Sequence, residues 1–95
     1  MFLLSITEVN KYFKDDDARM CEPTDQAIKN GAWTTSSYSV DGCATCYWWL
    51  RSPGGNGSIA SGVFGNGRVD TYGNYMNISD DAVRPALYID LNLIP

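Results

Sequence analysis

Three cysteines and an acidic tract are the residues of this chain whose types and spacing could do chemistry. Cys43 and Cys46 are two residues apart, Cys21 lies upstream of them, and the chain has no histidine. A structural zinc site needs a fourth ligand, which neither a second cysteine pair nor a histidine supplies. A thioredoxin-like redox motif opens a helix, whereas this pair runs directly into residues of strand type. We therefore expect neither metal nor redox catalysis, and both unlinked thiols and one disulfide remain open.

The acidic tract is Asp15, Asp16 and Asp17. It lacks the alternating ligands, the glycine and the distal glutamate of an EF-hand loop, so we interpret it as a solvated loop. The chain also shows no spaced pair of a nucleophile and a base. The sequence predicts no metal site, no cofactor and no enzymatic activity.

The stretch that must position the remaining residues is 47–54, Tyr-Trp-Trp-Leu-Arg-Ser-Pro-Gly. A strand here sends Trp48 to one face and Trp49 to the other, so both faces need cover. Pro53 and the glycine after it end the strand. The predicted core comprises Trp48, Trp49, Leu50, Leu87 and Ile89.

Two short helices are predicted before this strand. Ser5 and Glu8 form a capping box, which starts a helix that runs to about Phe13. Its inward residues are Ile6, Val9 and Phe13.

The second helix begins after Thr24, the predicted N-cap, and runs to about residue 30. Ala27 and Ile28 are its expected inward residues. Residues 33–42 show no sustained periodicity and are interpreted as a loop with a possible short strand.

Strand signals follow in the C-terminal half. Residues 60–64 and 68–72 flank Gly-Asn-Gly, which predicts a hairpin. Residues 83–91 form a further strand, and we expect residues 2–4 to pair with residues 87–91. Arg84 is either a buried hydrogen-bonding anchor or a solvated side chain. The fold class is therefore α+β, with antiparallel strands joined by long loops.

Length and charge limit the class of protein. The chain has 95 residues and a net charge of −4, which fits a single domain, residues 1–95, that we expect to be part of a longer protein. Its seven basic residues are scattered, so we expect no nucleic-acid partner. We find no apolar run of the roughly 18 residues that span a membrane, and no signal peptide in this chain. No membrane insertion is expected.

Four motifs stand in order along the chain: Phe2-Leu3-Leu4-Ser5, Cys21-Glu22-Pro23-Thr24, Tyr47-Trp48-Trp49-Leu50-Arg51-Ser52-Pro53-Gly54 and Val83-Arg84-Pro85-Ala86-Leu87. Together they resemble a bacterial domain family of uncharacterised function, common in gut Firmicutes and their phages. The resemblance covers nearly the whole chain and implies a C-type-lectin-like fold with paired terminal strands. Some members resemble variable proteins of diversity-generating retroelements, in which changes at template adenines randomise Asn codons.

Residues 55–82 fit such a diversified segment in composition. An Asn codon changed only at its adenines never yields Lys, Glu, Gln, Met or Trp, and the segment contains one Met and none of the others. Ordinary amino-acid usage predicts about five residues of these types in a segment of this length. Any loop rich in Gly, Asn and Ser also contains few of them. The predicted scaffold positions are Ala60, Val63, Gly67, Val69, Gly73 and Met76. The predicted displayed, ligand-binding positions are Asn56, Ser58, Ile59, Phe64, Asn66, Arg68, Asp70, Thr71, Tyr72, Asn74, Tyr75, Asn77, Ser79 and Asp80.

The resulting hypothesis is a non-catalytic ligand-binding module, a receptor or adhesin that displays residues 55–82. Its expected partner is a protein or glycan ligand on a cell surface, and an oligomer is compatible with this function. The expected location is a phage virion or a bacterial cell surface, or outside the cell. The alternative is an undiversified structural or adhesive domain. Calcium-dependent sugar binding does not carry over, because the carboxamide motif and paired disulfides of animal C-type lectins are missing.

Overall fold

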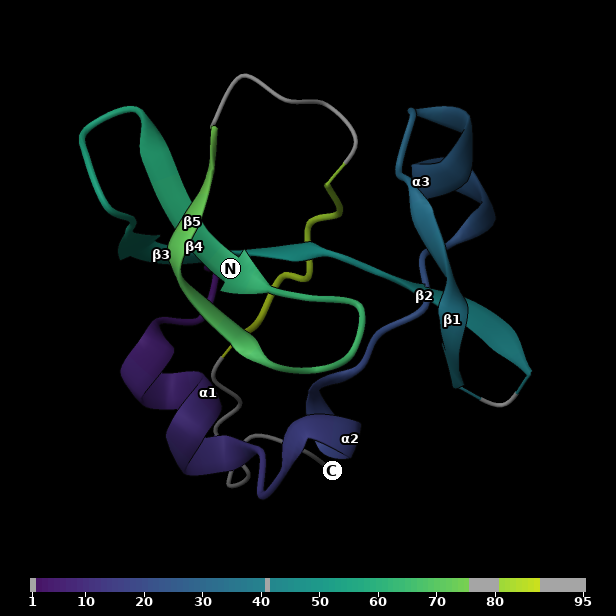
Figure 1. Ribbon diagram of the computed structural model, residues 1–95, viewed down its shortest axis with the longest axis horizontal. Coiled ribbons are helices and arrows are strands. Elements are labelled where there is room, and N and C mark those ends of the chain that lie inside the picture. Colours follow the sequence, from purple (N-terminus) through teal and green to yellow (C-terminus); the bar gives the residue numbers. More distant parts are fainter. Residues whose placement is uncertain (1, 41, 76–80, 88–95) are drawn as a thin grey trace, which may run out of the picture.

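The computed structural model describes residues 2–40, 42–75 and 81–87, and the fold of these residues is α+β (Figure 1). The described helices are α1 (Ile6–Tyr12), α2 (Asp16–Arg19) and α3 (Asp25–Lys29). The described strands are β1 (Thr34–Val40), β2 (Cys43–Cys46), β3 (Trp48–Pro53), β4 (Ile59–Val63) and β5 (Val69–Tyr75). In Figure 1 the β1–β2 hairpin and α3 lie on one side of the molecule and the β3-β4-β5 sheet on the other, with β2 leading directly into β3.

The first predicted helix is confirmed as α1. The Ser5 hydroxyl accepts from the Glu8 N–H at 3.1 Å, and the Glu8 carboxylate accepts from the Ser5 N–H at 2.9 Å. Val9 is fully buried, while Ile6 and Phe13 are partly buried and pack against the same core. The capping box therefore starts this helix, and its apolar face covers the sheet.

The second predicted helix is confirmed as α3. The Thr24 hydroxyl accepts from the Ala27 N–H at 3.1 Å, which makes Thr24 the N-cap. The prediction that Ile28 points inward is wrong, because its side chain is 50% exposed. A helix of five residues presents one narrow face, and here Ala27 is the half-buried residue.

The acidic tract is not the predicted loop, and this adds a third helix to the two that were expected. Asp15 caps α2 by accepting from the Ala18 N–H at 2.8 Å. Arg19, in the last turn, is buried at 9% exposure. Its guanidinium pairs with Asp16 and donates from Nε to the Gly67 carbonyl oxygen at 2.8 Å. The tract thus brings a buried arginine to the hairpin of β4 and β5.

The predicted hairpin is confirmed. β4 and β5 are antiparallel, with Val63 opposite Val69 and Ile59 opposite Tyr75, and β5 runs three residues further than expected. The segment expected to be mostly loop is instead the strand β1, which pairs with β2. The Thr, Tyr and Val residues of β1 favour a strand, and the search for sustained periodicity did not reveal its partner.

The two terminal segments meet, but over a shorter length than predicted. Phe2 and Ala86 form an antiparallel bridge with hydrogen bonds of 2.8 and 2.7 Å, and Ala82 forms a parallel bridge with Trp48. The bridge lies one residue before the predicted partner range of 87–91, of which residues 88–91 are outside the described part. The continuous strands expected at residues 2–4 and 83–87 are not found there. Leu87 is 57% exposed, so its predicted burial is wrong. Leu87 directly follows the bridge between Phe2 and Ala86, and the described residues leave more than half of its side chain exposed. Ile89 is outside the described residues.

Trp48 is at the centre of the core. It is 0% exposed, Leu50 next to it on the same face is 1% exposed, and Trp49 on the opposite face is half-buried. The Trp48 indole N–H donates to the Arg19 carbonyl oxygen at 3.0 Å. The Arg84 guanidinium lies 4.8 Å from the Trp48 ring and 5.1 Å from that of Phe13, a cation–π arrangement that neither interpretation of Arg84 anticipated.

We expect Trp48→Ala to lower the free energy of unfolding by about 3–5 kcal/mol, because it opens a cavity and leaves the Arg19 carbonyl oxygen unpaired. Trp33→Ala is the matched control: Trp33 is 65% exposed, so the cost should stay within about 0.5 kcal/mol. Urea unfolding followed by circular dichroism measures both. Equal losses in the two variants would contradict the central place of Trp48.

Candidate ligand-binding site

The turn between β4 and β5 is held by backbone contacts. The Gly67 N–H donates to the Phe64 carbonyl oxygen at 2.9 Å, and the Gly67 carbonyl accepts from Arg19. Gly67 has a φ of 88°, and a Cβ there would overlap the Asp16 carbonyl oxygen. Only glycine fits this position. The turn is therefore held against α2 through its backbone, and none of its exposed side chains takes part in this contact.

A groove lies between this turn and the β1–β2 hairpin. It consists of two adjoining hollows of about 220 and 330 Å³ that share Trp33, Thr35, Phe64 and Gly65. We call it the aromatic groove. Its lining residues are Trp33, Thr35, Tyr38, Thr45, Cys46, Tyr47, Phe64, Gly65, Asn66, Arg68, Asn74 and Asp81.

Large exposed rings surround the aromatic groove. Trp33 is 65% exposed, Tyr38 47% and Phe64 44%. The Phe64 ring packs edge-on against Tyr47 at 5.7 Å between centroids, and Tyr47 packs in the same way against Trp49 at 5.9 Å. Phe64 is thus exposed on one side and supported on the other. Clustered exposed rings of this kind mark interaction sites on soluble proteins.

A buried hydroxyl joins the two walls of the aromatic groove. Thr45 on β2 is 0% exposed and donates to the Gly65 carbonyl oxygen at 2.7 Å. A side chain at Gly65 would crowd the Thr35 methyl group. The turn therefore lies directly against the β1–β2 hairpin, and the groove has a fixed floor.

Hydrogen-bonding groups and charged side chains of both signs lie in and beside the aromatic groove. The Tyr47 hydroxyl donates to the Asp70 carboxylate at 3.0 Å, and the Asn74 amide donates to Asp81 at 3.0 Å. Burial first, and then the negative charge of Asp70, raise the pKa of the Tyr47 hydroxyl well above its usual value near 10. Arg68 is exposed at the other end. The arrangement offers stacking surfaces with hydrogen-bonding groups at their edges.

The residues that we predicted to be displayed differ in how exposed they are. Three of them, Asn66, Asp70 and Asn74, are half-buried, and Asn77, Ser79 and Asp80 lie outside the described residues. The exposed ones are Asn56, Ser58, Phe64, Arg68, Thr71, Tyr72 and Tyr75.

Display of Ile59 was a wrong prediction. Its side chain is 2% exposed, because Gly54 and Gly73 leave the space that it fills.

The predicted displayed residues do not all share one surface. The aromatic groove brings together Phe64, Asn66, Arg68 and Asn74, whereas the Tyr72 ring lies against Gly55. The predicted scaffold positions do have structural reasons. Val63 is fully buried, Val69 packs against the core, and Gly73 has a φ of 96° with no room for a side chain. Met76 is outside the described residues.

Sequence reasoning missed half of the groove. Trp33 and Tyr38 fall in the segment interpreted as loop, and Tyr47 falls in the stretch 47–54, which was expected to position other residues. One signal was present: a Trp and a Tyr among Thr and Ser residues is the composition that antibody paratopes use.

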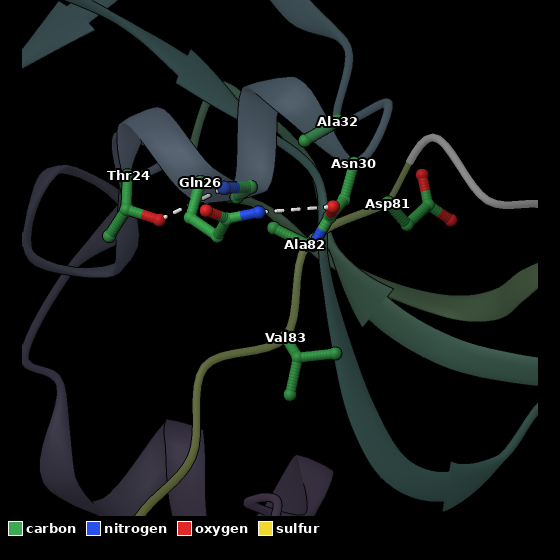
Figure 2. Close-up of a pocket in the computed structure, with 8 residues that line it drawn as sticks. Thr24, Gln26, Asn30, Ala32, Asp81, Ala82 and Val83 are labelled. Carbon is green, nitrogen blue, oxygen red and sulfur yellow. Dashed lines mark hydrogen bonds between the residues drawn. The ribbon is translucent and has the colours of Figure 1, made fainter.

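A separate hollow of about 290 Å³ lies between α3 and residues 81–83 (Figure 2). Figure 2 shows Gln26 and Asn30 on its helix wall, joined by a hydrogen bond of 3.2 Å, with Asp81 and Val83 on the facing segment. Unlike the aromatic groove, it is lined without any ring. Among the described residues, no three His, Cys, Asp or Glu side chains gather as a metal site, and no helix is long and apolar enough to cross a membrane.

Comparison with known proteins places the chain in a family. A family model described as "Domain of unknown function (DUF6273)" matches residues 1–91. The chain belongs to this family. The expected membership in an uncharacterised family is therefore confirmed, and the DUF6273 match includes both walls of the aromatic groove. No curated protein and no solved structure matches the chain.

Tyr47→Phe tests the hydrogen bond beneath the groove. At neutral pH we expect a loss of about 1–2 kcal/mol in the free energy of unfolding, because the half-buried Asp70 loses a donor. The pKa of Tyr47 is raised in the folded state, so its contribution is complete below about pH 10 and is lost as the pH rises further. The parent should therefore lose stability between about pH 10 and 11.5 more steeply than the variant, by up to about 1.4 kcal/mol per pH unit.

Urea titrations at several pH values measure both effects. Tyr72→Phe is the control, because it removes an exposed hydroxyl from β5, the strand that also carries Asp70, and should follow the parent curve. Parallel alkaline curves for the parent and Tyr47→Phe would contradict the assignment.

Proposed function

We propose that this chain is a non-catalytic ligand-binding module that holds a protein or glycan ligand in the aromatic groove. We further propose that the domain is C-type-lectin-like, that exposed positions within residues 55–82 are diversified as in retroelement variable proteins, and that it acts on a phage virion or bacterial surface. The observation that carries the proposal is the cluster of exposed rings at Trp33, Tyr38 and Phe64 around one groove.

The energetic argument rests on the exposed rings. Leaving three large aromatic side chains in water gives up the stabilisation that burying them would supply, at roughly 25 cal/mol per Å² of apolar surface. A bound ligand recovers part of this free energy, and each ring orders few torsions when it does so. Asn66 and Arg68 lie at the edge, where amide and guanidinium groups direct a polar ligand. Rings within a polar rim are typical of binding sites.

Diversification is supported by the way the turn is held. Its backbone depends on Gly67, the buried Arg19 and the buried Thr45. Phe64 and Arg68 hold the turn through their main chains: the Phe64 N–H donates to the Arg68 carbonyl oxygen at 2.9 Å, and the Phe64 carbonyl oxygen accepts from the Gly67 N–H at 2.9 Å. Replacing these side chains therefore leaves the groove in place while changing what it contacts.

The alternative is an undiversified structural or adhesive domain, and other residues of the segment favour it. Ile59 is buried, Asp70 accepts from the Gly73 N–H at 2.9 Å, and Asn74 bonds to Asp81. Free variation at these positions would cost stability. A near-copy of the segment beside a reverse-transcriptase gene, with differences confined to exposed positions, would favour diversification. Its absence from the genome would favour the alternative.

The binding test uses ligands selected from an immobilised glycan array and a random-peptide library. We expect Trp33→Ala and Phe64→Ser each to weaken the Kd of the selected ligand by at least about tenfold, the loss typical of a central aromatic contact. Tyr12→Ala is the matched control, because Tyr12 is a ring on α1 that is 56% exposed and outside the groove. Its Kd should stay within about twofold of the parent's. Selected ligands that bind both groove variants as tightly as the parent would refute the groove as the site.

The diversification test is a thermal melt of the fourfold variant Phe64→Ser, Arg68→Asn, Tyr72→Asn and Tyr75→Ser. All four side chains are exposed, so we expect a nearly unchanged melting temperature together with lost binding. The alternative function predicts the opposite, because its loop residues stabilise the domain. A variant that is unfolded at ordinary temperature would therefore favour the alternative.

A further inference from the structure

Two of the three cysteines lie side by side at the junction of the two sheets. Cys21 is in the connection between α2 and α3, and Cys46 is the last residue of β2. The Cys46 N–H donates to the Cys21 carbonyl oxygen at 2.8 Å, and the Cys46 sulfur lies 3.4 Å from the same oxygen.

This geometry suits a covalent link. A backbone hydrogen bond between two residues holds their Cα atoms at about the separation that a disulfide spans, roughly 4.4–6.8 Å. Cys43 is not an equivalent partner. Residues three apart on a strand point to opposite faces, and Cys43 is exposed whereas Cys46 is buried.

The two thiols differ in reactivity. Cys21 is half-buried and Cys46 is buried. The hydrogen bond from Cys46 lowers the pKa of the Cys21 thiol to about 6; burial and the Glu22 carboxylate oppose this, and the Arg84 charge adds to it. The hydrogen bond with Cys21, then burial, raise the pKa of the Cys46 thiol, which Arg84 lowers and Asp81 raises further. Cys21 is therefore the accessible nucleophile and Cys46 the buried proton donor.

We propose that Cys21 and Cys46 form a hydroperoxide-reactive pair that oxidises to an intramolecular disulfide. The Cys21 thiolate attacks one oxygen of hydrogen peroxide, the O–O bond breaks, and the departing hydroxide takes a proton to become water. This leaves Cys21 as a sulfenic acid. The Cys46 thiol then gives up its proton and attacks the Cys21 sulfur, the S–O bond breaks, and a second water leaves. Two thiols and one peroxide thus yield one disulfide and two waters.

The disulfide joins the connection between α2 and α3 to β2, close to Trp48. Cys46 also lines the aromatic groove, and its neighbour Thr45 holds the turn. The link therefore fastens the floor of the groove to the helical part of the chain. This inference is independent of the proposed ligand, since it depends only on the two thiols.

Peptide mapping after peroxide treatment tests the proposal. Folded protein is treated with hydrogen peroxide, alkylated and digested with trypsin, which separates residues 20–29 from residues 30–51. Since the second peptide carries both Cys43 and Cys46, the mapping is repeated in Cys43→Ser. We expect the linked peptide pair, two hydrogens lighter, in both proteins. Protein unfolded in urea is the control, because there the shortest loop, Cys43 to Cys46, should dominate.

Variant kinetics test the roles of the two cysteines. Cys21→Ser should lose thiols to peroxide at least about tenfold more slowly than the parent, whereas Cys43→Ser should react at the parent's rate. Cys46→Ala, checked for folding by circular dichroism, should accumulate a Cys21 sulfenic acid that dimedone captures. The absence of a link between residues 20–29 and 30–51 in folded Cys43→Ser would overturn the proposal, whatever the other variants do. Equal rates for Cys21→Ser and the parent would overturn it as well.

Discussion

The burial of Trp48 is the constraint on which the rest of the structure depends. An indole is large and carries one N–H, so burying it needs both apolar cover and one acceptor. Phe13 and Arg84 cover the ring, and the Arg19 carbonyl oxygen accepts from the N–H. Phe13 and Arg19 belong to the helical segment, whereas Arg84 belongs to the C-terminal segment. The helical segment, the sheet and the C-terminal segment are therefore held at the same residue.

The aromatic groove is a consequence of this arrangement. Arg19 uses its carbonyl for Trp48 and its side chain for Gly67, so one buried residue connects the core to the hairpin turn. Thr45 connects the same turn to the β1–β2 hairpin. The turn is thus fixed from both sides through main-chain oxygens, which leaves the exposed rings available for contacts with a ligand.

Local signals in the sequence predicted the parts of the fold that depend on neighbouring residues. Ser5 with Glu8, Thr24, and the Gly-Asn-Gly turn each specify a cap or a hairpin within a few residues, and all three are confirmed. The failures have two causes. Burial of Arg19 requires a turn 48 residues away, which no local pattern encodes. The pairing of β1 with β2, in which Val40 lies opposite Cys43, is local, and the Asp-Gly between these residues is a hairpin signal that the search for sustained periodicity overlooked. Only half of the groove was therefore predicted.

For the proposed function, it matters physically that the two walls of the aromatic groove come from different segments of the chain. One wall presents Trp33, just before β1, and Tyr38, within β1, both outside residues 55–82. The other wall presents Phe64 and Arg68 from within that segment. Rings on the constant wall supply apolar contact that does not depend on the varied sequence. Changes on the other wall then alter shape and charge, and so select among ligands. A groove with one constant and one variable wall keeps a basal affinity while its specificity changes, which a site built wholly from varied residues does not.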